Sequence, residues 1–226
     1  MLPFRWLVLI GIVVLPLVWA LWLTEVVSFS FARLGLSPGA TALVLLGSLV
    51  GGWINIPIWR RRLHVAGSDG WQVLFPWSEV FPGRSGWLFY QPPRIREQVI
   101  AINLGGALIP LAVDLFLLPR APLEPLLGAV AGVAAVSYAL ARPAWPVGIV
   151  LPPFVPPLAA ALLAEVLAPG AAPVVAYIAG TLGTLVGADL LHLPDLERFD
   201  AQVLSIGGAG VHDGIFFAGV VAALLT

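Results

Sequence analysis

Long apolar stretches recur along the chain, and they constrain its fold more than any other feature. A helix needs about 20 apolar residues to cross the hydrocarbon core of a bilayer, whereas a membrane β-barrel needs alternating strands of about ten. The stretches here are continuous, 60% of the 226 residues are hydrophobic and only 10% are charged. Soluble domains carry about 25% charged residues. The sequence therefore predicts an all-α integral membrane protein, a single polytopic membrane domain over residues 1–226.

We expect about seven transmembrane helices, at residues 4–24, 38–58, 98–118, 122–141, 145–167, 172–192 and 207–225. The first stretch continues through Trp22 without a small-residue cleavage site, so it is predicted to be a retained helix and not a signal peptide. The fifth contains four prolines between Pro152 and Pro157. Each proline removes a backbone donor, so this span is predicted to be broken, and broken spans often line a cavity or pathway.

The distribution of arginine predicts the orientation of the chain. All 11 basic residues are arginine. If the N-terminus is cytoplasmic, nine of the 11 lie on the inner side, which satisfies the positive-inside rule. The chain has no cysteine, which excludes disulfides and thiolate chemistry.

Residues 59–97 form the one sizeable segment between spans, a predicted cytoplasmic loop between spans two and three. Apolar and aromatic residues alternate loosely between Trp71 and Trp77, and again at Trp87 and Phe89, with turn-forming sequences nearby. This pattern predicts a short hairpin. Two interpretations remain open: an aromatic belt beside a polybasic lipid anchor, and a sheet edge that captures an extended peptide.

Two carboxylates lie a few residues inside the predicted cytoplasmic face. Asp189 comes near the end of the sixth span and Asp213 near the start of the seventh. A carboxylate at membrane depth is costly and rarely without a function. The C-terminal end of a helix disfavours a carboxylate and the N-terminal end favours one, so the two environments differ. Carboxyls that meet and share one proton can act on a water as base and acid, so both residues are candidate catalytic residues.

Small and polar residues surround this pair. The glycines either admit a substrate backbone or only pack helices. Asn55 and Asn103 lie near small residues and a proline in spans two and three, where an amide can join two helices or support the carboxylates. The candidate supporting residues are Gly187, Gly208, Gly210, His212, Gly214 and Asn103.

Two histidines lie beside the carboxylates. His192 follows Asp189 by three residues, and His212 directly precedes Asp213. Two histidines and two aspartates could bind zinc or another divalent ion, but no HExxH or other strong metal spacing is present. We therefore predict no metal and no other cofactor. A proton relay and a plain interfacial position remain open for both histidines.

The chain resembles a family of multi-pass prokaryotic membrane proteins that is described only as a domain of unknown function. The resemblance rests on GADLLHL, SIGGAGVHDGIFFAGVVAALL, GGWINIPI, INLGGALIP and the proline-rich fifth span, and it covers roughly residues 40–226. It implies a multi-pass protein of the inner (plasma) membrane of a prokaryote. It implies no activity.

More distantly, about 40 residues of this region, Gly180 to Gly219, resemble the GxGD intramembrane aspartyl proteases, the class of presenilin and signal peptide peptidase. Gly210 to Asp213 match the motif, with His212 in place of its second glycine, and Asp189 takes the role of the first aspartate. The resemblance implies an intramembrane aspartyl endopeptidase that acts on peptide bonds of membrane-embedded substrates. The expected partners are membrane lipid and a membrane protein or peptide substrate, with no nucleic acid.

Two other functions fit the same residues. Intramembrane carboxylates also bind protons or cations in transporters and channels, whose helices are often discontinuous like the predicted fifth span. A membrane scaffold without catalysis would leave the two aspartates without a role. The sequence leaves the substrate and the oligomeric state open.

Overall fold

The computed structural model describes residues 4–64, 70–73, 88–91, 95–144, 148–196, 203–208 and 214–226. The chain divides into two compact units. The first comprises Met1–Ile56, Ile102–Phe199 and Ser205–Thr226, and the second comprises Pro57–Ala101 and Asp200–Leu204. The predicted loop 59–97 falls within the second unit. The candidate residues Gly210, His212 and Asp213 lie outside the described residues.

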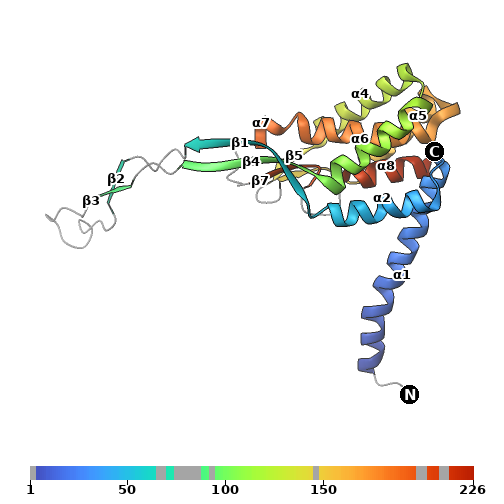
Figure 1. Ribbon diagram of the computed structural model, residues 1–226, viewed down its shortest axis with the longest axis horizontal. Coiled ribbons are helices and arrows are strands. Elements are labelled where there is room, and N and C mark those ends of the chain that lie inside the picture. Colours follow the sequence, from blue (N-terminus) through green and yellow to red (C-terminus); the bar gives the residue numbers. More distant parts are fainter. Residues whose placement is uncertain are drawn as a thin grey trace. The chain divides into compact units, whose positions relative to one another are not determined.

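The chain is mostly helical (Figure 1). Its α-helices are α1 (Phe4–Arg33), α2 (Pro38–Gly51), α3 (Ile109–Leu117), α4 (Leu123–Leu140), α5 (Val155–Leu167), α6 (Ala172–Thr184), α7 (Leu193–Leu196) and α8 (Gly214–Leu225). Two π-helical segments extend this set, η2 (Leu104–Leu108) before α3 and η5 (Leu185–Leu190) after α6. Short 3-10 turns follow α3 at η3 (Leu118–Arg120) and precede α6 at η4 (Pro169–Ala171).

The described residues also form three small sheets, so the predicted all-α class is corrected to a mostly helical one. Strands β1 (Asn55–His64), β4 (Ile95–Asn103) and β7 (Val203–Ile206) pair in the order β1-β4-β7. Strand β2 (Gly70–Val73) pairs antiparallel with β3 (Leu88–Gln91), which confirms the hairpin predicted in segment 59–97. Strand β5 (Arg142–Ala144) pairs antiparallel with β6 (Gly148–Val150).

The second and third predicted spans are only partly helical. Helix α2 ends at Gly51 and a strand follows, whereas a helix to residue 58 was predicted; similarly, the predicted span 98–118 begins as strand β4. Short apolar runs rich in isoleucine and valine suit a strand as well as a buried helix, so periodicity does not separate the two. Pro57 lies in β1, an edge strand of its sheet, where the missing N–H is tolerated.

The fifth predicted span is broken, as expected. Strand β6 ends at Val150 and helix α5 begins at Val155, with Pro156 in its first turn. The first helical turn tolerates proline because its N–H groups have no intrahelical acceptor. The fourth and sixth spans match α4 and the α6–η5 pair, the first continues to Arg33, and the last helix starts at Gly214.

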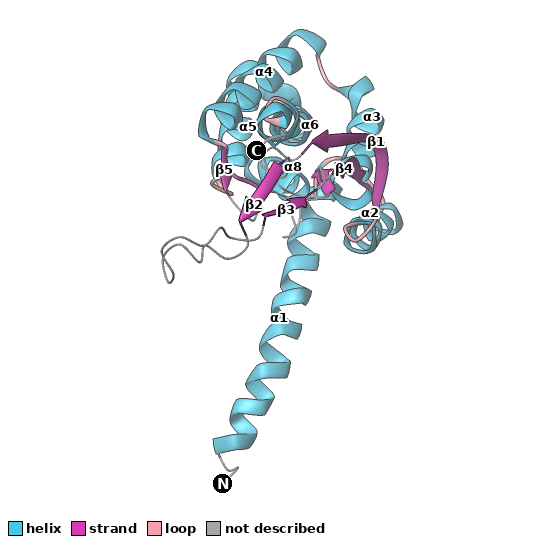
Figure 2. Cartoon of the chain, turned by 90° about the vertical axis from the view of Figure 1, so that its left-hand side faces the viewer, coloured by secondary structure: helices cyan, strands magenta, loops and turns pink. Residues whose placement is uncertain are grey.

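Helix α6 lies among α4, α5 and α8 and packs against all three (Figure 2). Small residues allow this close packing. A methyl group on Gly180 would come within 2.9 Å of the carbonyl oxygen of Ala218, and one on Gly183 within 2.6 Å of Cβ of Val133. The side chains of Tyr177 and Ile178 are fully buried. Helix α6 is therefore the centre of the core.

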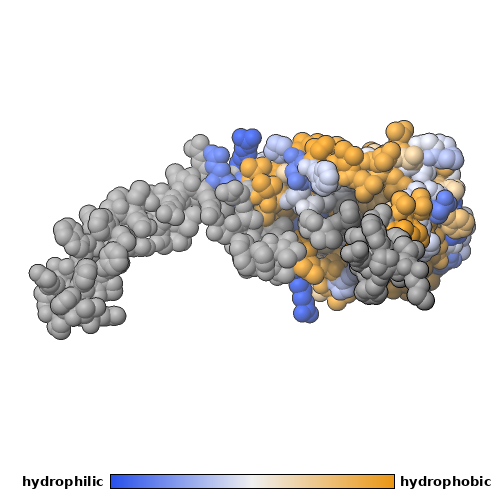
Figure 3. Space-filling view, turned by 90° about the horizontal axis from the view of Figure 1, so that it is seen from below, coloured by the Kyte–Doolittle hydropathy of each residue, from blue (hydrophilic) through white to orange (hydrophobic). Residues whose placement is uncertain are grey.

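Apolar side chains cover much of the helical surface (Figure 3). Leu115 on α3 is 70% exposed and Val166 on α5 is 77% exposed. Among the described residues, three stretches are long and apolar enough to cross a membrane, Val14–Arg33, Leu123–Leu140 and Pro169–Leu190, while α2, α5 and α8 are apolar but shorter. An apolar surface of this extent suits lipid and not water, which supports the predicted membrane class.

Candidate functional site

Asp189 lies in the π-helical segment η5 that ends α6, and its side chain is partly exposed. The backbone N–H of Gly207 donates a hydrogen bond of 2.6 Å to Oδ2 of Asp189. Gly207 directly follows β7 and has a φ of 73°, a conformation that glycine adopts without strain. The carboxyl of Asp189 is therefore hydrogen-bonded to the turn that directly follows β7.

The turn at Gly207 packs against η2, the π-helical segment that precedes α3. A methyl group on Gly207 would come within 2.6 Å of Cβ of Ala107 and 2.9 Å of its backbone nitrogen. A methyl group on Gly208 would come within 2.4 Å of Oγ of Ser205 and 2.9 Å of Nδ2 of Asn103. Gly208 therefore serves here as a position of close packing.

Asn103 joins three segments through its amide group. Its Oδ1 accepts a hydrogen bond of 2.8 Å from the N–H of Gly106, which caps η2. Its Nδ2 donates to the carbonyl oxygen of Gly52 over 2.8 Å and to Oδ1 of Asn55 over 3.1 Å. Ser205 donates from its hydroxyl to the same Oδ1 of Asn55. Through these bonds the second and third predicted spans are connected to Ser205, which lies two residues before Gly207.

These contacts show how Asn103 joins neighbouring segments, and its role as a support of the carboxylates stays a prediction. It fastens α2 to η2, and through Asn55 and Ser205 it is connected to the turn whose N–H bonds to Asp189. Sequence reasoning did not select Ser205 as a site residue. The only signal was a hydroxyl two residues before the glycine pair in SIGG.

Gly187 and His192 have packing contacts. A methyl group on Gly187 would come within 2.3 Å of the carbonyl oxygen of Ala134, so Gly187 allows η5 to approach α4. Nδ1 of His192 lies 3.0 Å from the carbonyl oxygen of Gly187, and its ring centroid lies 4.8 Å from that of Tyr138. The imidazole is 6% exposed. In the part of the chain that the structure describes, no group of three or more His, Cys, Asp or Glu residues is arranged to hold a metal ion.

Helices α6 and α8 run antiparallel. Gly180 faces Ala218 in the middle of both helices, while Asp189 bonds to Gly207, which precedes α8. The end of α6 and the beginning of α8 therefore lie at the same end of the bundle. Gly214, the predicted supporting residue that begins α8, is exposed, and a methyl group there would meet no atom within 4 Å.

A second carboxyl lies deeper in the helices. Asp114, which was not among the predicted site residues, is buried between α3 and α6 at 4% exposure. Oγ1 of Thr181 on α6 lies 2.6 Å and 2.8 Å from the two carboxyl oxygens. An aspartate within the apolar run IPLAVDLFLL was the signal that could have identified it.

The comparisons with known proteins identify the family. No curated protein and no solved structure matches the chain. A family described as a protein of unknown function, DUF1614, matches residues 49–225, which include Asn103, Asp114, Asp189 and the turn at Gly207. The description carries no activity. Because the match covers most of its length, the chain belongs to the DUF1614 family.

Proposed function

We propose that the protein is an intramembrane aspartyl endopeptidase, distantly like presenilin, in which Asp189 and Asp213 act together on peptide bonds of membrane-embedded substrates. The observation that carries the proposal is the hydrogen bond between Gly207 and Asp189. Asp213 follows Gly207 by six residues and is bonded directly to Gly214, the first residue of α8. The antiparallel arrangement of α6 and α8 supports a meeting of the two carboxyls.

The proposed reaction uses one water and two carboxyls that share a proton. The ionised carboxyl takes a proton from the water, whose oxygen attacks the substrate carbonyl carbon, while the protonated carboxyl donates to the carbonyl oxygen. The tetrahedral intermediate then collapses, the C–N bond breaks and a proton passes to the leaving amine. The products are a carboxylic acid and an amine. The mechanism uses no covalent intermediate and no metal.

The local structure around Asp189 supports a specialised site. Asp189 lies in the π-helical segment that follows α6, and Asn103 caps the one that precedes α3. The π-helical conformation is rare and occurs frequently at functional sites. The hydrogen bonds of Asn103, Asn55 and Ser205 connect η2 to the segment before Gly207, and the N–H of Gly207 connects the turn to η5. Preorganisation of this kind is what an acid/base pair needs.

The proposal includes a location. A cytoplasmic N-terminus puts nine of the 11 arginines on the cytoplasmic side, as the positive-inside rule favours. In this orientation, cleavage occurs near the inner face of a prokaryotic plasma membrane. The substrate is then a membrane protein or peptide whose helix is unwound near that face.

Cleavage of a transmembrane peptide by the purified protein in liposomes tests the proposal. Asp189→Asn and Asp213→Asn should each lower the rate by at least ~100-fold, because an amide cannot carry the proton. A transition-state-mimicking aspartyl protease inhibitor should block the native protein. Glu124→Gln and Glu165→Gln, which change exposed carboxylates on α4 and α5, serve as matched controls with unchanged rates. Full cleavage by either aspartate variant contradicts the proposal.

The alternative is a proton- or cation-coupled transporter or channel that uses the same carboxylates. The observation that favours it is Asp114, a second buried carboxyl held by Thr181 on the helix that leads to Asp189. Eight residues separate Thr181 from Asp189, about 12 Å at the helical rise of 1.5 Å per residue. Ion flux into liposomes that persists when peptide cleavage is absent, and that changes in Asp189→Asn, would favour transport.

A further inference from the structure

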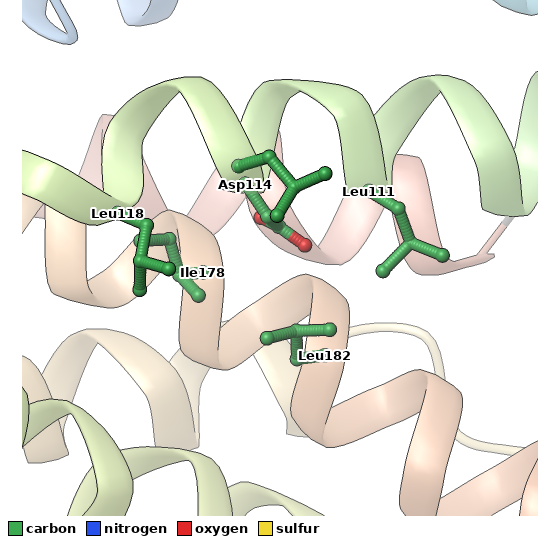
Figure 4. A pocket seen from close by; sticks show the side chains of 6 residues that line it. Leu111, Asp114, Leu118, Ile178 and Leu182 are labelled. Atoms are coloured by element: carbon green, nitrogen blue, oxygen red, sulfur yellow. The ribbon is translucent and has the colours of Figure 1, made fainter.

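Asp114 is not a member of the proposed acid/base pair, and its surroundings are apolar. It lies on the inner side of a hollow of about 200 Å³ between α3 and α6 (Figure 4). The other residues that line this hollow are aliphatic: Leu111, Leu115, Leu118, Ile178 and Leu182. A carboxyl in such surroundings is costly unless its charge is neutralised.

Within the described part of the chain, the elements that pack most against α3 offer Asp114 no neutralising side chain. Among α2, η2, α3, η3, α6 and α8, the other charged or titratable residues are Arg120 and Tyr177. Arg120 comes six residues after Asp114 and therefore on a different side of the helix. Its guanidinium donates to the carbonyl oxygen of Leu34 over 2.8 Å and lies 4.7 Å from the centroid of the Phe116 ring.

The hydroxyl oxygen of Thr181 lies within hydrogen-bond distance of four other oxygen atoms. Oγ1 of Thr181 lies 2.6 Å and 2.8 Å from the carboxyl oxygens of Asp114, 3.0 Å from the carbonyl oxygen of Tyr177 and 3.1 Å from that of Ile178. A hydroxyl donates only one hydrogen. If it donates to a carbonyl of its own helix, the short contact to Asp114 needs a hydrogen from the carboxyl.

We infer that Asp114 and Thr181 form a buried proton-binding site between α3 and α6. The carboxyl of Asp114 binds the proton and donates it to Oγ1 of Thr181, whose own hydrogen goes to the carbonyl oxygen of Tyr177. Oxygen separations of 2.6 Å and 2.8 Å are those of direct hydrogen bonds. The site is separate from Asp189 and does not depend on the proposed peptidase activity.

Infrared spectroscopy of the full chain in lipid tests this inference. At neutral pH the native protein should show the carbonyl stretch of a protonated carboxylic acid, and Asp114→Asn should lose that band. Glu124→Gln removes an exposed carboxylate and should leave the band unchanged. A native protein without a band that Asp114→Asn removes would overturn the inference.

A matched pair at Thr181 tests the inference while Asp114 stays in place. Thr181→Val removes the hydroxyl at nearly the same volume, so the band should move to higher wavenumber as the acid loses its acceptor. Thr181→Ser keeps the hydroxyl and should keep the band at its native position. This pair keeps the inference testable if Asp114→Asn does not fold. Equal band positions in the two variants would show that the acid does not donate to Thr181.

Discussion

At the scale of single residues, polar side chains hold the candidate site together. Asn103 satisfies the N–H of Gly106 and donates to Gly52 and Asn55, all within the apolar part of the chain. A buried group that loses its partner costs about 1–3 kcal/mol, and Asn103 serves three groups at once. Asn103 is therefore expected to stabilise the contact between α2 and η2.

Replacing Asn103 by alanine should lower the free energy of unfolding by about 2–4 kcal/mol, because the capping bond and two amide donors are lost together. Ser48→Ala is the matched control. It removes a single hydrogen bond, from Oγ of Ser48 to the carbonyl oxygen of Gly105 in the same α2–η2 contact, and should cost about 1 kcal/mol. Thermal unfolding in detergent measures both. Equal losses in the two variants would refute the special role of Asn103.

The sequence indicates some of these residues and not others. Asp189 and Asn103 were predicted because a lone polar group in an apolar helix is costly and needs a reason. Thr181 was not, since hydroxyls are common in membrane helices and can bond to their own backbone. Ser205 was not either, because it lies in β7, outside the predicted spans. Their partners, Asn55 and Asp114, lie 150 and 67 residues away in the chain, and only the fold brings them together.

At the scale of the elements, close helix packing depends on small residues at defined positions. Helix α6 and its π-helical end meet α4 at Gly183 and Gly187 and meet α8 at Gly180. In lipid, where apolar burial adds little, such backbone approach contributes much of the attraction between helices. The glycines of the sixth span are therefore packing residues in the structure.

Gly187→Ala should destabilise the protein by about 1–3 kcal/mol, because its methyl group would lie 2.3 Å from the carbonyl oxygen of Ala134 and one backbone must move. Gly39→Ala in the first turn of α2 is the control. No atom lies within 4 Å of that methyl group, so the better helix propensity of alanine should leave stability equal or raise it by up to ~1 kcal/mol. Melting temperatures measure the difference. A Gly187→Ala protein as stable as Gly39→Ala would contradict the close α4–η5 contact.

The prediction of helices succeeded where apolar runs were long and failed where they contained strands. Spans four and six are continuous apolar runs, and α4 and α6–η5 match them. Spans two and three combined a strand with a helix in a single apolar run. The change falls after Gly51 in span two and at Asn103, the cap of η2, in span three. The break in the fifth span was predictable because proline has a local effect on the backbone.

At the scale of the whole molecule, composition was enough to predict the membrane class, because no arrangement of a chain that is 60% hydrophobic can bury all of that surface. The same composition does not reveal which polar groups meet. The match to DUF1614 covers the carboxylates and their supports together, so the candidate site lies within the family region.

The most direct test of the central claim is whether positions 189 and 213 meet in the folded protein. The chain has no cysteine, so a double Asp189→Cys, Asp213→Cys variant introduces the only thiols. Mild oxidation in lipid followed by mass spectrometry of the digest should detect a disulfide between the two positions, which requires Cα atoms within about 7 Å.

Two further pairs calibrate this measurement. Asn55→Cys with Ser205→Cys should also form a disulfide, because the native side chains are in contact. Gly170→Cys with Asp213→Cys should not, since Gly170 lies before α6, at the opposite end from Asp189. A disulfide between positions 189 and 213 is the result that the proposed acid/base pair predicts. Its absence in a folded sample in which the Asn55 and Ser205 positions do cross-link would contradict the pair.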